Sequence, residues 1–318
     1  MSSAHLMVAA GGSPEDRAAP RWQWISKWGG LGTKPKQEGE ELDGKHVEDA
    51  GDVWMIDDME RGLSREIATD LLQPLRKSSR LWRFNVTRSD NNLEYRLFTD
   101  GWDFLMLASV SLQSQSVLFY QYDSTEHGCT ESRPSFTMTF SADKKEWRLM
   151  HERCEFCQYV PHHRTCAACN QKQVVAVVRH VQEMVGDGLF HGMEISIPTV
   201  SQDGDRALWC PLRGVGRYSG GQVLAAGFGD TPHDNYDGVQ KLVTKKPAWN
   251  DDVASLVLDF RGRNVLSSSK NFQIAGGARG GVVCQFGKVG PSTFGLDFNH
   301  PLSVAQAFAV ALSTMFWK

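Results

Sequence analysis

Four of the seven cysteines lie in one short stretch, CEFCQYVPHHRTCAAC, at residues 154–169. They form two C-x-x-C pairs separated by eight residues. Each pair can chelate one metal ion, and Zn²⁺ prefers four nitrogen or sulfur ligands in a tetrahedral array. The spacing predicts a structural zinc site whose ligands are Cys154, Cys157, Cys166 and Cys169.

Two alternatives stay open for this stretch. His162 or His163 can replace one thiolate as a ligand, or the loop can hold reduced thiols or an oxidised pair. A catalytic zinc site is not favoured, because four thiolates leave no open position for water. No H-E-x-x-H or H-x-E motif accompanies the cysteine pairs, and the glycine-rich run at 276–281 does not match a phosphate-binding loop. We therefore expect a protein that is not an enzyme.

Composition sets the broad class. The chain has 318 residues, of which 41% are hydrophobic and 22% charged, and its formal net charge is −3. This balance provides no global basic field, so nucleic acid is not an expected partner. The sequence shows no signal peptide and no transmembrane segment. The odd number of cysteines favours reduced thiols and a cytoplasmic location.

The elements that must carry the cysteine loop are mostly strands. Residues 1–50 are rich in Gly, Ser, Pro, Lys and Glu and are predicted to be a disordered tail. From residue 82 the hydrophobic period is two: Trp82, Phe84 and Val86 alternate with polar residues, and a second alternating run follows the turn at 89–92. Further short strands are predicted at 104–108, 117–122, 136–140, 174–178, 193–197, 255–260, 271–274, 281–286 and 294–298.

The last segment, residues 301–316, is helical by composition, and its apolar residues lie on every side. Such a helix must be buried all round. In a chain of strands this predicts a closed antiparallel barrel with a hydrophobic helix threaded through it, and a helix packed between two domains is the alternative. Pro301 suits the first helical position, with Asn299 or His300 as the cap.

Short blocks between residues 242 and 316 resemble the tubby-like family. The blocks are 242–252 (LVTKKPAWNDD), 256–263 (LVLDFRGR), 269–273 (SKNFQ), 285–289 (QFGKV), 297–298 (DF), 301–302 (PL) and 306–309 (QAFA). The resemblance implies a barrel of about twelve strands around a central C-terminal helix, spanning residues 51–318. It places the cysteine-rich loop, at about 150–170, between two barrel strands as an insertion.

The resemblance also implies a function. Tubby-like domains are non-enzymatic, bind phosphoinositides at the inner face of the plasma membrane, and several carry membrane cargo into cilia. We therefore expect an adaptor whose partners are a phosphoinositide membrane surface and ciliary transport or membrane cargo proteins. Its location would be cytoplasmic and peripheral to the plasma membrane or cilium.

The sequence departs from the family at the lipid-binding cations. The family places a Lys/Arg run after an LLAG-like strand, where this chain reads SVSLQSQS at 109–116. A second family arginine falls near Phe140, and a G-P-R-K-M turn becomes LFHGM at 189–193. The lipid-binding residues are therefore left unassigned. Basic residues elsewhere are interpreted as a solvated strand face: Arg80, Arg83, Arg88, Arg96, Lys144, Lys145 and Arg148. The alternative function is a regulator that binds protein or nucleic acid through the zinc-stabilised loop.

Overall fold

The structure is a computed structural model. It describes residues 5–10, 21–26, 70–123, 128–129, 133–154, 172–186, 188–200, 206–210, 214–219, 222–226, 238–250, 255–260, 262–276 and 280–316.

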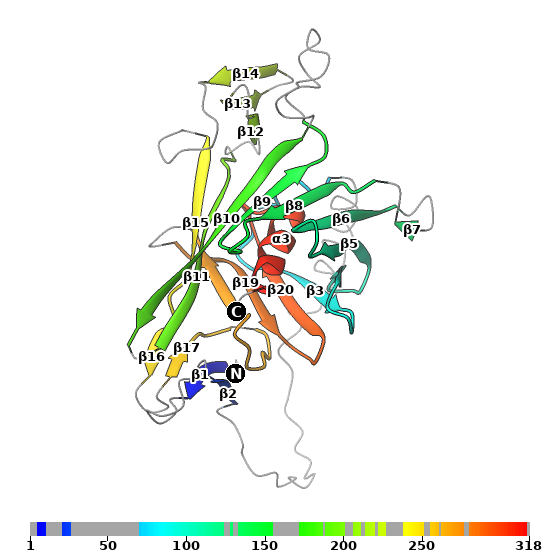
Figure 1. Ribbon diagram of the computed structural model, residues 1–318. Coiled ribbons are helices and arrows are strands. Elements are labelled where there is room, and N and C mark those ends of the chain that lie inside the picture. Colours follow the sequence, from blue (N-terminus) through cyan, green and yellow to red (C-terminus); the bar gives the residue numbers. More distant parts are fainter. Residues whose placement is uncertain are drawn as a thin grey trace, which may run out of the picture.

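Twelve antiparallel strands form a closed barrel, shown in Figure 1. The strand order is β5-β4-β3-β20-β19-β18-β15-β11-β10-β9-β8-β6, and pairing between β5 and β6 closes the ring. The predicted barrel is confirmed. Its strands are β3 (Trp82–Arg88), β4 (Glu94–Thr99), β5 (Phe104–Ser111), β6 (Ser116–Asp123), β8 (Phe136–Phe140), β9 (Glu146–His151), β10 (Gln173–Val185), β11 (Gly188–Pro198), β15 (Val239–Thr244), β18 (Phe272–Ala275), β19 (Val282–Lys288) and β20 (Thr293–Phe298).

Smaller strands lie outside the ring. β7 (Gly128–Cys129) pairs with β6. β1 (His5–Ala10) pairs with β2 (Arg21–Ser26), and β1 lies against β17 (Ser255–Val257), which pairs with β16 (Ala248–Asn250). A three-stranded sheet contains β12 (Ala207–Cys210), β13 (Gly214–Ser219) and β14 (Gln222–Ala226). Figure 1 shows that sheet standing beyond one end of the long β10–β11 hairpin.

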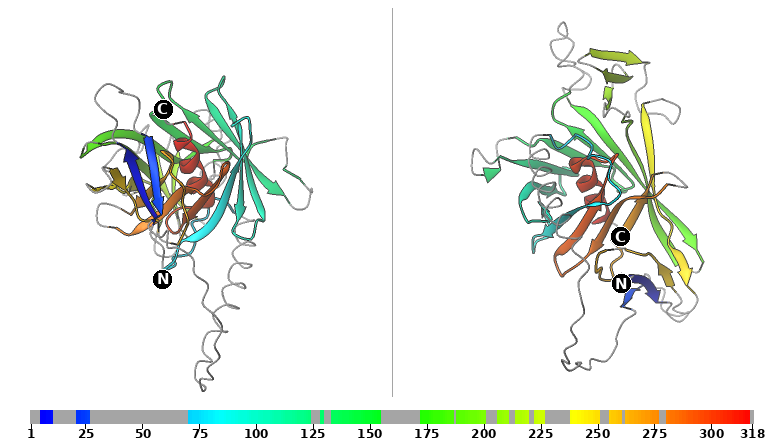
Figure 2. Two further views of the ribbon diagram at one scale, coloured as in Figure 1. Left: turned by 90° about the horizontal axis from the view of Figure 1, so that it is seen from below. Right: turned by 180° about the vertical axis from the view of Figure 1, so that it is seen from behind.

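The helix α3 (Val304–Thr314) runs through the barrel, and all of its residues are buried. Figure 2 shows the strands surrounding it on every side. Phe308 on the helix meets Phe119 of β6 edge to face, with ring centroids 5.7 Å apart. The expectation of an enclosed helix is therefore confirmed, and the helix supplies the barrel core that inward strand residues alone would leave unfilled.

The predicted start of the helix was wrong. Pro301 lies before the helix, and the cap is Ser303 rather than Asn299 or His300. Ser303 Oγ accepts from the backbone N–H of Gln306, and the Gln306 side chain accepts from the backbone N–H of Ser303. This reciprocal capping box satisfies two amide groups inside the buried core, where water cannot do so.

A strap of residues 258–260 and 262–270 crosses the outer face of the barrel. Its anchor is Arg263, whose guanidinium donates to both carboxylate oxygens of Asp297, to Asn85 Oδ1 and to the carbonyl of Phe84. Gly295 permits this approach, because a Cβ there would lie 3.0 Å from Arg263 Nε. The strap therefore joins β20 and β3, the last and first strands of the ring.

Candidate functional site

One end of the barrel gathers the residues that can meet an anionic surface. It is the end at which α3 finishes, and we call the turn β5–β6 (residues 111–116) together with the turn β8–β9 (residues 141–145) the rim. Ser116 is paired with Thr139, and the backbone N–H of Phe140 donates to the carbonyl of Gln115 at 3.2 Å. The two turns are therefore neighbours, although they are distant in the sequence.

The β8–β9 turn is held by its own side chains. Ser141 Oγ donates to Asp143 Oδ1 at 2.5 Å, and the same carboxylate oxygen accepts from the backbone N–H of Lys145. The hydrogen bond from Ser141 holds the pKa of Asp143 below its ordinary value. Lys144 has a φ of 58°, in the left-handed region. The turn thus presents two consecutive lysines in a defined conformation.

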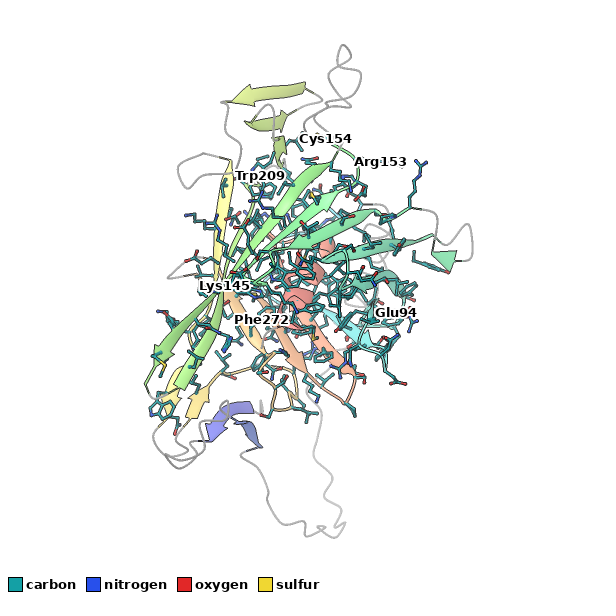
Figure 3. The ribbon with its side chains drawn as sticks, in the orientation of Figure 1. Glu94, Lys145, Arg153, Cys154, Trp209 and Phe272 are labelled. Carbon is teal, nitrogen blue, oxygen red and sulfur yellow. The ribbon has the colours of Figure 1, made fainter. Side chains whose placement is uncertain are left out.

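The two lysines differ in their surroundings. Lys144 is half-buried, with its ammonium 5.7 Å from the centre of the Phe316 ring just beyond α3. Lys145 is exposed, and its carbonyl accepts from the backbone N–H of His180 at 2.7 Å. Figure 3 labels Lys145 beside the strands of the β10–β11 hairpin. Lys144 complements the negative end of the α3 dipole, whereas Lys145 is available to a ligand.

A second group of charges lies directly next to this turn. Glu146 accepts from Arg148 at 2.8 Å and from Arg179 at 3.3 Å, so one carboxylate serves two guanidinium groups. The hydrogen bond from Arg148 is the main reason why the pKa of Glu146 is lowered. Lys144, Lys145, Arg148 and Arg179 lie near Asp143 and Glu146, and Glu194 lies opposite Arg179 in the β10–β11 register. Four cations and three carboxylates leave this end of the barrel with one excess positive charge among these described residues.

The β5–β6 turn contributes hydroxyl groups and an exposed apolar side chain. Ser114 Oγ and Ser116 Oγ are 2.7 Å apart, and Leu112 is 56% exposed at the tip. Leu93, in the neighbouring β3–β4 turn, is 38% exposed, and its carbonyl accepts from the N–H of Val110. Exposed apolar side chains beside cations are typical of surfaces that contact membranes.

Burial lowers the pKa of His180 and of two other titratable groups near it. Burial lowers the pKa of His180 to about 4, and its ring lies 3.0 Å from Ser313 Oγ. Burial also lowers the pKa of Lys270 to about 8 and lowers the pKa of His191. His180 therefore adds no charge to the rim at neutral pH.

Three other basic residues named in the sequence analysis make contacts within the protein. Arg83 donates to the carbonyl of Gly262 on the strap, and Arg88 lies over the ring of Phe294. Arg96 pairs with Glu94 on the barrel surface. The expectation of a solvated strand face describes Arg96, whereas Lys144 and Lys145 lie in the β8–β9 turn beside the β5–β6 turn. Only the pairing of β6 with β8 reveals this proximity.

Of the four cysteines in the cluster, Cys154 alone lies within the described residues. Cys154 is buried at the end of the segment that follows β9, and Figure 3 labels it at the opposite end of that strand from Lys145. Cys157, Cys166, Cys169, His162 and His163 lie outside the described residues. Within the described ranges, no group of three or more His, Cys, Asp or Glu residues is placed to hold a metal. The zinc site stays a prediction.

Fold and site together define a closed barrel around a buried helix, with a basic rim where the helix ends. The chain belongs to the Tub family, whose model matches residues 71–316. It is 49% identical over 75 residues to Tubby-related protein 3 of Mus musculus, which covers 23% of this chain and 16% of that protein.

Other relatives agree with this assignment. The chain is 33% identical over 150 residues to Protein king tubby 2 of Aedes aegypti, covering 47% of the chain and 34% of that protein. It is 44% identical over 85 residues to Protein king tubby 1 of the same species, covering 26% and 21%. The matches thus span about a third or less of these relatives.

A helix that spans a bilayer needs about 20 predominantly apolar residues. In the part of the chain that the structure describes, no helix is long and apolar enough to cross a membrane.

Proposed function

We propose that this tubby-like protein is a non-enzymatic adaptor that binds phosphoinositide-containing membranes through the rim and brings protein cargo to them. The observation that carries the proposal is the position of Lys144 and Lys145 beside the β5–β6 turn. That turn is where the family resemblance expects a run of cations. Lysines from the next hairpin thus replace cations that the turn itself lacks.

The chemistry of the rim supports a weak, multivalent contact. Exposed lysines attract anionic headgroups, and each contributes about 1 kcal/mol near a charged membrane surface. The exposed hydroxyl of Ser114 can donate to phosphate oxygens. Leu112, at the tip of the turn, can bury its side chain at the acyl boundary for about 1.5–3 kcal/mol. Such a contact holds the protein at the membrane surface and lets it dissociate again.

Family membership supports a second kind of partner, membrane cargo proteins in ciliary transport. It also supports a location at the plasma membrane or cilium. The cysteine loop begins at the other end of β9 from the lysines. A structural zinc there would stabilise the loop without taking part in lipid binding.

Vesicle sedimentation tests the lipid contact. Vesicles of phosphatidylcholine with phosphatidylinositol 4,5-bisphosphate are mixed with the full chain at several salt concentrations. We expect binding that weakens as salt rises, because surface charges are screened. The double variant Lys144→Ala/Lys145→Ala loses about 1–2 kcal/mol, because Lys144 is half-buried and only Lys145 is exposed, and partitioning falls about five- to thirtyfold.

The control removes the same charge elsewhere. Arg76→Ala/Lys77→Ala changes two exposed cations in the segment that leads into β3, at the other end of the barrel. If this control weakens binding as much as the rim variant, the contact is a general charge effect. If the unaltered chain shows no salt-sensitive binding, the lipid proposal is wrong.

A further inference from the structure

The connection between β4 and β5, at the end of the barrel away from the rim, displays a tryptophan in an unusual conformation. Trp102 has a φ of 68°, and its side chain is 55% exposed. The left-handed region is sterically costly for a bulky residue, and glycine or asparagine would fit this position more easily. A strained, exposed tryptophan therefore points to a role for the indole itself.

The turn is held firmly by its neighbours. The backbone N–H of Trp102 donates to the carbonyl of Thr99 at 3.1 Å, and that of Asp103 donates to Thr99 Oγ1 at 3.0 Å. Asn85 donates to the same Thr99 carbonyl, and Arg263 of the strap in turn donates to Asn85. The indole is therefore presented by a rigid base, which lowers the entropy lost when a ligand binds.

Trp102 is the outermost ring of an aromatic row that crosses three strands. Its ring centroid is 5.5 Å from that of Phe98, Phe98 is 5.5 Å from Phe104, and Phe104 is 5.4 Å from Tyr122. Neighbouring rings are tilted by 49–60°. Phe98, Phe104 and Tyr122 are half-buried, so the row offers partly accessible ring faces along the outside of β4, β5 and β6.

Carboxylates flank the exposed end of the row. Asp100 and Asp103 lie two residues before and one residue after Trp102, and both are exposed. Asp100 lies 3.9 Å from Arg263, a guanidinium that is already bound by Asp297. Aromatic faces attract cations, and arginine is the side chain that both stacks on an indole and pairs with carboxylates.

We propose that the aromatic row binds an arginine-rich, extended segment of a partner protein. One guanidinium stacks on Trp102 and pairs with Asp100 or Asp103, and the following residues lie along Phe98, Phe104 and Tyr122. The acidic flanks disfavour nucleic acid and anionic lipid at this surface. The surface therefore differs in chemistry from the rim at the other end of β5.

The two surfaces lie at opposite ends of the same strands. β5 runs from Phe104, beside the tryptophan turn, to Ser111, where the rim begins. A membrane at the rim therefore leaves the aromatic row open to a protein. The inference goes beyond the lipid proposal, because binding at the row needs no membrane.

Fluorescence polarisation with defined peptides tests the inference. The probe is a labelled ten-residue peptide of alternating arginine and glycine, and its counterpart carries glutamate in place of arginine. We expect the full chain to bind the arginine peptide at least tenfold more tightly than the glutamate peptide. Equal binding of the two peptides, or no binding of either, would overturn the proposal.

Trp102→Gly is the decisive variant. Glycine accepts the positive φ, so the turn keeps its conformation and the thermal midpoint does not fall, while affinity for the arginine peptide drops at least tenfold. Leu266→Gly, which removes another exposed apolar side chain (48% exposed, on the strap), serves as the matched control and keeps the affinity. Full binding by Trp102→Gly would refute the role of the indole.

Two further arms separate the alternatives. Asp100→Asn removes one flanking charge and is expected to weaken the arginine peptide at least threefold without changing stability. Neutral phosphatidylcholine vesicles test whether Trp102 instead anchors the protein to a bilayer. If the protein sediments with those vesicles and Trp102→Gly abolishes the sedimentation, the ligand of Trp102 is a membrane. That result would overturn the proposal.

Discussion

Replacing Arg263 by methionine removes the anchor of the strap and should be costly. The guanidinium, whose side chain is 14% exposed, makes three hydrogen bonds to the Asp297 carboxylate at 2.6, 2.9 and 3.1 Å and also binds Asn85 and the carbonyl of Phe84. Asp297 is 4% exposed, so Arg263→Met leaves a buried carboxylate whose remaining described side-chain donor is Gln285, at 2.9 Å. Breaking one side of a buried pair costs about 3–5 kcal/mol of unfolding free energy.

Urea unfolding of the full chain, followed by tryptophan fluorescence and circular dichroism, measures this loss. The matched control is Arg96→Ala, because Arg96 pairs with Glu94 where both side chains are largely exposed. It should cost less than about 1 kcal/mol. The double variant Arg263→Met/Asp297→Leu should recover most of the stability, since no lone charge stays buried. A loss below about 1 kcal/mol for Arg263→Met would refute this account of the strap.

Three other predictions concern the helix, the buried histidine and the cysteine loop. Ser303→Ala removes the capping box of α3 and should lower the unfolding free energy by about 1–2 kcal/mol in the same urea assay; an unchanged midpoint would contradict it. His180 has a folded pKa of about 4 against an ordinary value of 6.5, so the unfolded chain binds the extra proton first. Stability should therefore be full above about pH 6.5 and fall by up to about 3 kcal/mol toward pH 4, and His180→Gln should flatten this slope in thermal unfolding at stepped pH. The full chain should carry about one zinc ion by mass spectrometry, and Cys166→Ser/Cys169→Ser should lose it; folded, metal-free protein with four titratable thiols in the loop would disprove the site.

Hydrophobic periodicity and composition were enough to predict the strands and the enclosed helix. The alternation from Trp82 to Val86 predicted strands, and the helix without a polar face favoured an arrangement in which the sheet encloses the helix over one in which the helix packs between two domains. The helix cap, in contrast, has a signal in the local sequence that points to the observed residue. Ser303 and Gln306 have the spacing of a capping box in the sequence itself, whereas Pro301 attracted the prediction through its helix-start preference.

The sites were harder to predict, because they depend on contacts between distant residues. Arg263 meets Asp297 and Asn85 across 34 and 178 positions, and no periodicity relates them. The β8–β9 turn with its two lysines lies beside the β5–β6 turn only because β6 pairs with β8. Trp102 appears in the sequence as one aromatic residue in a turn, and its positive φ follows from hydrogen bonds to Thr99.

The barrel has a consequence for how the protein reaches its folded state. The first barrel strand, β3, pairs with the last, β20, and α3 follows β20 in the chain. The ring cannot close, and its interior cannot fill, until these late segments have been synthesised. Such long-range pairing slows folding, and it leaves earlier strands with exposed edges in the meantime. We therefore expect the nascent chain to depend on chaperones, and we expect mutations in β20 or α3 to lower the yield of folded protein more than mutations of similar size in the surface turns.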